Sequence, residues 1–189
     1  MRPNAANYSF LHFSLSRLYQ IGLIVLLALT GFSCEKTPVN PVPVPDEPQL
    51  TGVLVLNEGL YGMNNSGITF FHPETQDWSN NWFQQHNGRP LGDTGNDMAI
   101  YGGKLYIIVS GSSQLEVIDL STGLSVAQIP FFDQGTPRQP RALAFHEDKA
   151  YVCSFDGSIA MIDTTSLQIQ KTVNVGHNPD GITVSNQKL

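Results

Sequence analysis

One segment of this chain occurs twice, and a neighbouring segment begins a third copy. Residues 104–109 (KLYIIV) recur as residues 149–153 (KAYVC), about 45 residues later. Residues 180–184 (DGITV) repeat the segment at 141–145 (RALAF), and the sequence ends at Leu189 before another tyrosine-containing strand. Repeats of this length build solenoids or rings, in which each unit buries its faces only against its neighbours. The repeat therefore restricts the fold to a row of similar units.

Each unit is a series of short strands. Residues 114–119 and 158–163 alternate in polarity and end in turn residues, with Asp119 and Asp163 at the same place. Outer runs follow at 125–129 and 168–173, and no convincing helical period occurs after residue 50. About four strands in 39 to 47 residues indicate one blade of a β-propeller. The first unit is more degenerate, with its clearest strands at 53–57, 68–71 and 97–101.

The predicted fold class is all-β, an incomplete β-propeller of about three four-stranded blades over residues 50–189. A closed ring needs about 4–8 blades. We expect the blade faces at the two flanks to be open to water and the chain to be marginally stable unless another piece completes the ring.

The first 33 residues have the order of a secretory signal peptide. Arg2 and Arg17 precede an apolar run at 21–30, and the small residues Gly31 and Ser33 follow it. Ten apolar residues are too few to span a hydrocarbon core of about 30 Å. The signal is followed by Cys34, and this arrangement resembles the lipobox of bacterial lipoproteins, which implies a lipidated Cys34. A plain secretory signal with an incidental cysteine is the alternative.

Residues 34–49 hold the lipidation site and a proline-rich linker with five prolines at nearly alternate positions. Such a segment favours extended polyproline conformation. We interpret it as a stalk that holds the folded part away from a membrane surface.

Charge and cysteine content exclude several classes of protein. The formal net charge is −6, and the ten lysines and arginines are scattered, which argues against nucleic-acid binding. With Cys34 lipidated, Cys153 has no partner for a disulfide, and we expect it to pack between blades.

We predict no catalytic residue, no cofactor and no metal site. The histidines lack a ligand spacing, and Glu58, Asp93 and Asp97 do not form a calcium-loop pattern. The Gly/Ser loops are not followed by a helix, and no G-x-S-x-G elbow occurs.

The candidate ligand-binding residues are aromatic, amide and charged side chains in irregular segments. They are Tyr61, Asn64, Trp78, Trp82, Asp93, Arg138 and Arg141. Aromatic rings beside amides are suited to a large, uncharged, partly flat ligand such as a corrinoid or a glycan. Packing at outer strands and corners is the alternative for the aromatic residues, and pairing with an acid of the next blade is the alternative for the arginines.

Two sets of motifs carry a resemblance to a known family. Residues 175–184 (VGHNPDGITV) and 149–152 (KAYV) resemble the signature of YVTN-type, YncE-like seven-bladed propellers. Residues 56–59 (LNEG), 91–93 (LGD) and 140–141 (PR) resemble motifs of a Bacteroidetes lipoprotein subgroup that includes a surface propeller capturing vitamin B12.

The resemblance implies a non-catalytic capture lipoprotein of the outer membrane that binds a corrinoid and works with a TonB-dependent transporter. The side of the membrane stays open. A propeller enzyme of lactonase or quinoprotein type and a protein-interaction scaffold are the alternatives.

Overall fold

The computed structural model describes residues 51–185. The predicted signal peptide at 1–33, the lipidation site Cys34 and the linker at 34–49 lie outside the described residues. Within 51–185, the structure has no helix long and apolar enough to cross a membrane.

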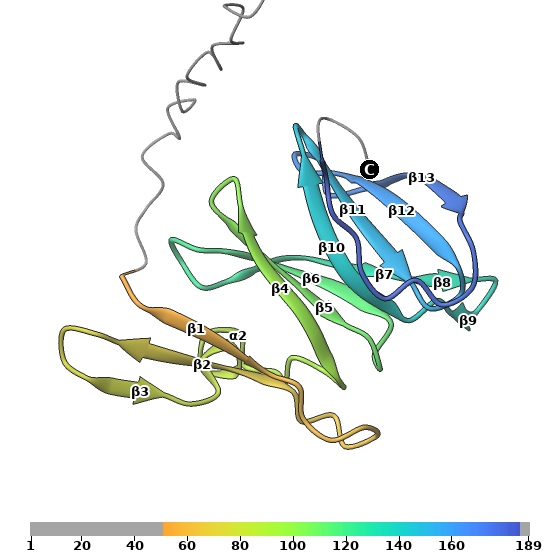
Figure 1. The fold of residues 1–189 in the computed structure, drawn as a ribbon. Helices are drawn as coiled ribbons and strands as arrows, with labels where there is room; N and C mark the ends of the chain where they lie inside the picture. Colours follow the sequence, from red (N-terminus) through yellow and green to blue (C-terminus); the bar gives the residue numbers. More distant parts are fainter. Residues whose placement is uncertain (1–50, 186–189) are drawn as a thin grey trace, which may run out of the picture. The chain divides into compact units, whose positions relative to one another are not determined.

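Three antiparallel sheets follow one another along the described chain (Figure 1). The first contains β1 (Val53–Asn57), β2 (Gly67–His72) and β3 (Asp77–Ser79). The second contains β4 (Gly95–Tyr101), β5 (Lys104–Val109), β6 (Gln114–Asp119) and β7 (Ser125–Pro130). The third contains β10 (Pro140–His146), β11 (Lys149–Ser154), β12 (Ser158–Asp163) and β13 (Ile169–Asn174).

In every sheet each strand pairs with the next one along the chain, which is the order of a propeller blade. A short hairpin of β8 (Phe132–Asp133) and β9 (Thr136–Pro137) connects the second and third sheets. The prediction of an all-β, incomplete propeller is confirmed, with one three-stranded and two four-stranded blades in residues 51–185.

The second blade buries both of its faces. Ile107 and Ile108 are adjacent on β5 and point to opposite sides, and both are fully buried. Ile107 packs with Ile68, Phe70 and other residues of the first blade. Ile108 packs in a second cluster that contains Val152 of the third blade. The period-2 pattern of the sequence therefore corresponds to two separate interfaces between blades.

One short helix lies between the first two blades, although the sequence predicts no helix there. The helix α2 (Trp82–Asn87) has six residues, too few to display a helical period. Its Trp82 and Phe83 are buried in the cluster between the first and second blades. Just after it, Arg89 forms an ion pair of 2.8 Å with the fully buried Glu116 of β6.

The strand predicted at residues 97–101 for the first unit belongs to the second blade. There it forms most of β4, the first strand, which pairs with β5. The first blade is correspondingly shorter, and the turn after β2 is closed by a hydrogen bond of 2.8 Å from Gln76 N to the carbonyl of His72.

Candidate ligand-binding face

The loops at the start of successive repeats share an unusual backbone conformation. Thr94, Gln139 and Asn178 have φ of 60°, 52° and 50°, and they precede Gly95, Pro140 and Pro179. The carbonyl of Thr94 accepts a hydrogen bond of 2.8 Å from Ser110 N, and that of Gln139 accepts one of 2.9 Å from Phe155 N. The left-handed residue therefore recurs at one position of the repeat, and in the second and third blades its carbonyl ties the first strand to the turn after the second strand.

The side chains two residues further along form a connected row across three repeats. Arg141 contacts Asp180 through Nε at 2.9 Å and Nη2 at 2.8 Å. With its amide oxygen facing Arg141, Asn96 accepts a hydrogen bond of 3.2 Å from Nη1. The strand registers are irregular between Gly95 and Asp97 and between Pro140 and Ala142. Because a bulged residue leaves the ladder, Asn96 and Arg141 are free to turn toward this row.

Beside this row the structure has a hollow of about 180 Å³. Two exposed aromatic rings contribute to it, Tyr61 (79% exposed) from the β1–β2 loop and Phe155 (47% exposed) from the β11–β12 turn. The other lining residues are polar or small: Thr94, Ser110, Gly111, Gln139 and Arg141. The hollow is therefore built from loops of all three blades.

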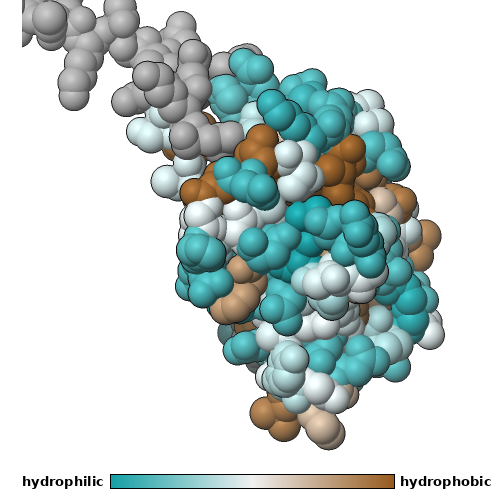
Figure 2. All heavy atoms as spheres, turned by 90° about the vertical axis from the view of Figure 1, so that its right-hand side faces the viewer, coloured by the Kyte–Doolittle hydropathy of each residue, from teal (hydrophilic) through white to brown (hydrophobic). Residues whose placement is uncertain are grey.

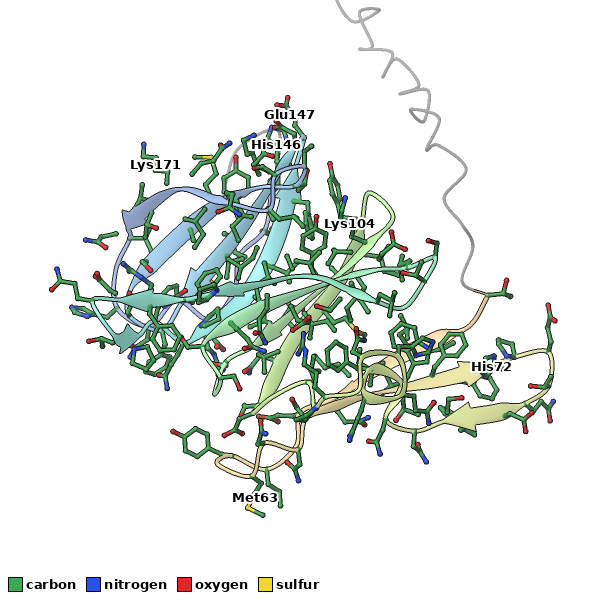
Figure 3. All side chains as sticks on the ribbon, turned by 180° about the vertical axis from the view of Figure 1, so that it is seen from behind. Met63, His72, Lys104, His146, Glu147 and Lys171 are labelled. Carbon is green, nitrogen blue, oxygen red and sulfur yellow. The ribbon has the colours of Figure 1, made fainter. Side chains whose placement is uncertain are left out.

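The loop that carries Tyr61 is fixed by hydrogen bonds to its own residues and to Asp93. Gly62 N donates to Oδ2 of Asp93 at 2.7 Å, and the hydroxyl of Thr94 donates to Oδ1 at 2.9 Å. Leu60 N donates to the Asn65 side chain at 2.8 Å. Asn64 lies in the same loop with φ of 51°. Met63 marks the tip of this loop, at the end of the blades opposite to Lys104, His146 and Glu147 (Figure 3).

Four of the predicted site residues thus lie at this face. Tyr61 and Arg141 line the hollow, Asp93 holds the Tyr61 loop, and Asn64 belongs to that loop. Their assignment to a binding site stays a prediction, but the fold brings them together from positions 61 to 141 of the chain.

The two tryptophans lie elsewhere. Trp82 is 5% exposed, on α2, with its ring centroid 6.4 Å from that of Phe70. Trp78 is 59% exposed on β3, the last strand of its sheet, and its ring lies 4.4 Å from that of Phe71. These positions correspond to the packing alternative that the sequence leaves open.

Arg138 lies beside a different hollow of about 430 Å³, lined by Asp133, Gln134, Thr136, Pro137, Arg138 and Asp156. Its guanidinium forms ion pairs with Asp156 at 2.7 Å and Asp133 at 3.1 Å. The pairing alternative holds for this arginine, since it joins the β8–β9 hairpin to the β11–β12 turn. Arg141 also pairs with an acid, Asp180, although it lines the smaller hollow as well.

Sequence reasoning missed five lining residues of the smaller hollow: Thr94, Ser110, Gly111, Gln139 and Phe155. Each lies in a turn whose local sequence carries no binding motif. The repeat relates four of them in pairs, since Thr94 and Gln139 are equivalent, as are the turn residues Ser110 and Phe155 that donate to their carbonyls, but the sequence marks no member of either pair as a binding residue.

Residues 51–185 contain no group of three or more metal-ligating side chains. Cys153 is buried in the third blade, as predicted, and burial raises the pKa of its thiol. A buried thiol with a raised pKa has little thiolate, so it is a weak nucleophile.

The blades and their loop face define a β-propeller protein with a small aromatic- and amide-lined hollow. The chain belongs to the family described as Domain of unknown function (DUF5074), which matches residues 51–188. No curated protein is similar to the chain at a significant level.

Solved structures share the fold at low identity. A hydrazine synthase from Kuenenia stuttgartiensis is 17% identical with a TM-score of 0.52, over 69% of this chain and 34% of that one. AztD from Citrobacter koseri is 20% identical with a TM-score of 0.49, over 69% of this chain and 34% of that one. The chain thus spans about a third of the length of these structures, and the likeness concerns the fold alone.

Proposed function

We propose that this chain is a non-catalytic ligand-binding protein of the bacterial cell envelope, which captures a small organic molecule at its loop face. The observation that carries the proposal is the hollow between Tyr61 and Phe155. Exposing the apolar surface of two aromatic rings to water is unfavourable unless a partner covers them. Exposed aromatic rings beside convergent polar groups are typical of ligand sites.

The proposal also includes a lipid anchor and a transporter as partner. Cys34 carries the lipid, the proline-rich linker holds the blades away from an outer membrane, and a TonB-dependent transporter receives the captured ligand. Two or more acyl chains, at about 0.8 kcal/mol for each buried CH₂, give stable anchoring. Replacement of Cys34 by Ser should move the full chain from the membrane to the soluble fraction, and unchanged membrane association would contradict lipidation.

A corrinoid is the candidate ligand from the sequence motifs. Because typical ligand sites measure about 300–1,000 Å³, a hollow of 180 Å³ can receive only one part of so large a molecule. If the motifs identify the ligand, the full-length protein in detergent should bind cyanocobalamin, measured by calorimetry, and the Tyr61→Ala and Phe155→Ala variants should bind about tenfold more weakly.

Phe132→Ala is the matched control. Phe132 lies on β8, is 47% exposed like Phe155, and does not line the hollow. Equal losses in Phe132→Ala and Phe155→Ala would place binding away from the loop face.

A further inference from the structure

The hollow has hydrogen-bonding groups that no protein atom uses. In the described part of the chain, neither the Ser110 hydroxyl nor the Gln139 side-chain amide has a hydrogen-bond partner. The Gln139 backbone is fixed on both sides, since its N donates to Oγ of Ser113 at 3.1 Å and its carbonyl accepts from Phe155 N. Gln139 therefore holds its free side-chain amide beside the hollow on a backbone fixed at φ of 52°.

The charges at the hollow are already compensated. Arg141 pairs with Asp180 and donates to Asn96. Asp93 accepts from Gly62 N and from the Thr94 hydroxyl. An anionic ligand would compete with Asp180 for the guanidinium, and a cationic one would compete with these donors for the carboxylate. The arrangement therefore favours a group without net charge.

The combination of aromatic rings and free polar groups restricts the chemical class of the ligand further. A purely apolar group between Tyr61 and Phe155 would cover the Ser110 hydroxyl and the Gln139 amide and leave them unpaired, which is costly. A hydroxyl and an amide each both donate and accept, as the hydroxyls of a sugar do. The C–H faces of a sugar ring are apolar and suit an aromatic surface.

We propose that the group bound in this hollow is a single uncharged pyranose ring of a glycan, held between Tyr61 and Phe155 and hydrogen-bonded by Ser110 and Gln139. This inference rests on the proposed ligand-binding function and gives the hollow a glycan, rather than the corrinoid of the sequence motifs, as its ligand. The volume of 180 Å³ fits one ring rather than an extended oligosaccharide.

The test uses saturation-transfer NMR on the full-length protein in detergent. The probes are methyl β-D-glucopyranoside and methyl β-D-galactopyranoside, with glucose 6-phosphate as the anionic comparison and cyanocobalamin as the corrinoid. We expect a signal from at least one neutral pyranoside, with a dissociation constant on the order of 1 mM for so small a ligand. The signal from glucose 6-phosphate should be at least threefold weaker.

Three variants and one control locate the ring. Tyr61→Ala and Phe155→Ala should reduce the pyranoside signal at least threefold, while Phe132→Ala keeps it. Gln139→Gly should reduce it as well without lowering the unfolding midpoint, since glycine suits the left-handed backbone. That separation of binding from stability distinguishes a ligand contact from a structural role.

The outcomes separate the two proposals. Binding of cyanocobalamin, lost in Phe155→Ala, with no pyranoside signal would overturn the sugar-ring inference and leave the proposed function standing. No signal from any probe would overturn both. Pyranoside binding that is unaffected by Tyr61→Ala and Phe155→Ala would place the sugar elsewhere and overturn the inference.

Discussion

At the scale of single residues, the left-handed backbone at the start of each repeat is the feature on which the loop face depends. Thr94 is β-branched, and a positive φ at such a residue is a real outlier that costs about 1–3 kcal/mol. The strain is offset by the hydrogen bond from Ser110 N and by that from Asp93 N to Oγ of Ser112 at 2.9 Å. Because the same conformation recurs at Gln139 and Asn178, the repeat itself brings polar side chains to one face.

A second residue-scale feature is the buried hydroxyl of Tyr106. The side chain is fully buried, its hydroxyl has no hydrogen-bond partner within residues 51–185, and burial, with smaller contributions from Tyr101 and Asp163, raises its pKa to about 12. Tyr106→Phe removes an unsatisfied group and keeps the edge contact with Phe145, so we expect the free energy of unfolding to rise by about 1 kcal/mol. Thermal unfolding measures it.

Tyr101→Phe is the control for that measurement. The Tyr101 hydroxyl donates to the carbonyl of Glu147, and its loss should lower stability by about 1 kcal/mol. If both variants lowered the midpoint equally, the Tyr106 hydroxyl would have a partner in solution.

At the scale of elements, the sequence predicts what local chemistry determines. The strands at 114–119 and 158–163 follow from alternation, and the turns after them follow from Asp119 and Asp163. The helix α2 could not be predicted, because its stability comes from burying Trp82 and Phe83 rather than from its own period.

The residues of the candidate site likewise divide into those that local sequence predicts and those that only the fold brings together. Tyr61 and Arg141 are conspicuous as an exposed loop aromatic and a charge beside proline. Phe155 and Gln139 become site residues only because the fold closes the loops of three blades around one hollow, and that closure depends on long-range pairing that a local pattern does not contain.

The turn aspartates make the two four-stranded blades sensitive to acid. Oδ1 of Asp163 accepts hydrogen bonds from Ser166 N at 2.7 Å and Thr165 N at 3.1 Å, and Oδ2 contacts Lys149 at 2.9 Å. These partners hold the pKa of Asp163 well below its usual range, and hydrogen bonds from Ser121 and Thr122 lower that of Asp119.

A carboxyl whose pKa is lower in the folded state stabilises the fold above the unfolded-state pKa of about 4, and the stabilisation is lost as pH falls below it. We expect the melting temperature to decrease as the pH falls below about 4. The decrease should be less steep in Asp163→Asn, whose amide oxygen still accepts the turn hydrogen bonds. Melting curves between pH 2 and 7 measure this. Asp148→Asn removes the other carboxylate at Lys149 but leaves the Asp163 turn, so a flattening equal to that of Asp163→Asn would contradict the assignment.

At the scale of the whole described unit, stability is divided between two interfaces rather than held in one core. The first and second blades share one cluster of buried residues, and the second and third share another. The side formed by β13 and the β8–β9 hairpin is mainly hydrophilic, with separate hydrophobic patches (Figure 2). Every residue of β13 is exposed, and polar residues such as Gln170 and Lys171 protect this edge strand from further pairing.

The adjacent residues Ile107 and Ile108 test whether these interfaces act separately. Each is fully buried, so Ile107→Ala and Ile108→Ala should each cost about 2–5 kcal/mol by leaving a cavity. Because each blade of a repeat protein contacts only its neighbours, the losses should appear in different places. Hydrogen exchange measured by mass spectrometry should show faster exchange in β1, β2 and α2 for Ile107→Ala, and in β10, β11 and β12 for Ile108→Ala.

Ile100→Ala is the matched isoleucine control, because Ile100 is 53% exposed, and it should change neither region. If Ile107→Ala and Ile108→Ala speeded exchange equally in all three blades, the blades would unfold as one cooperative unit, and the division of stability between two interfaces would be refuted.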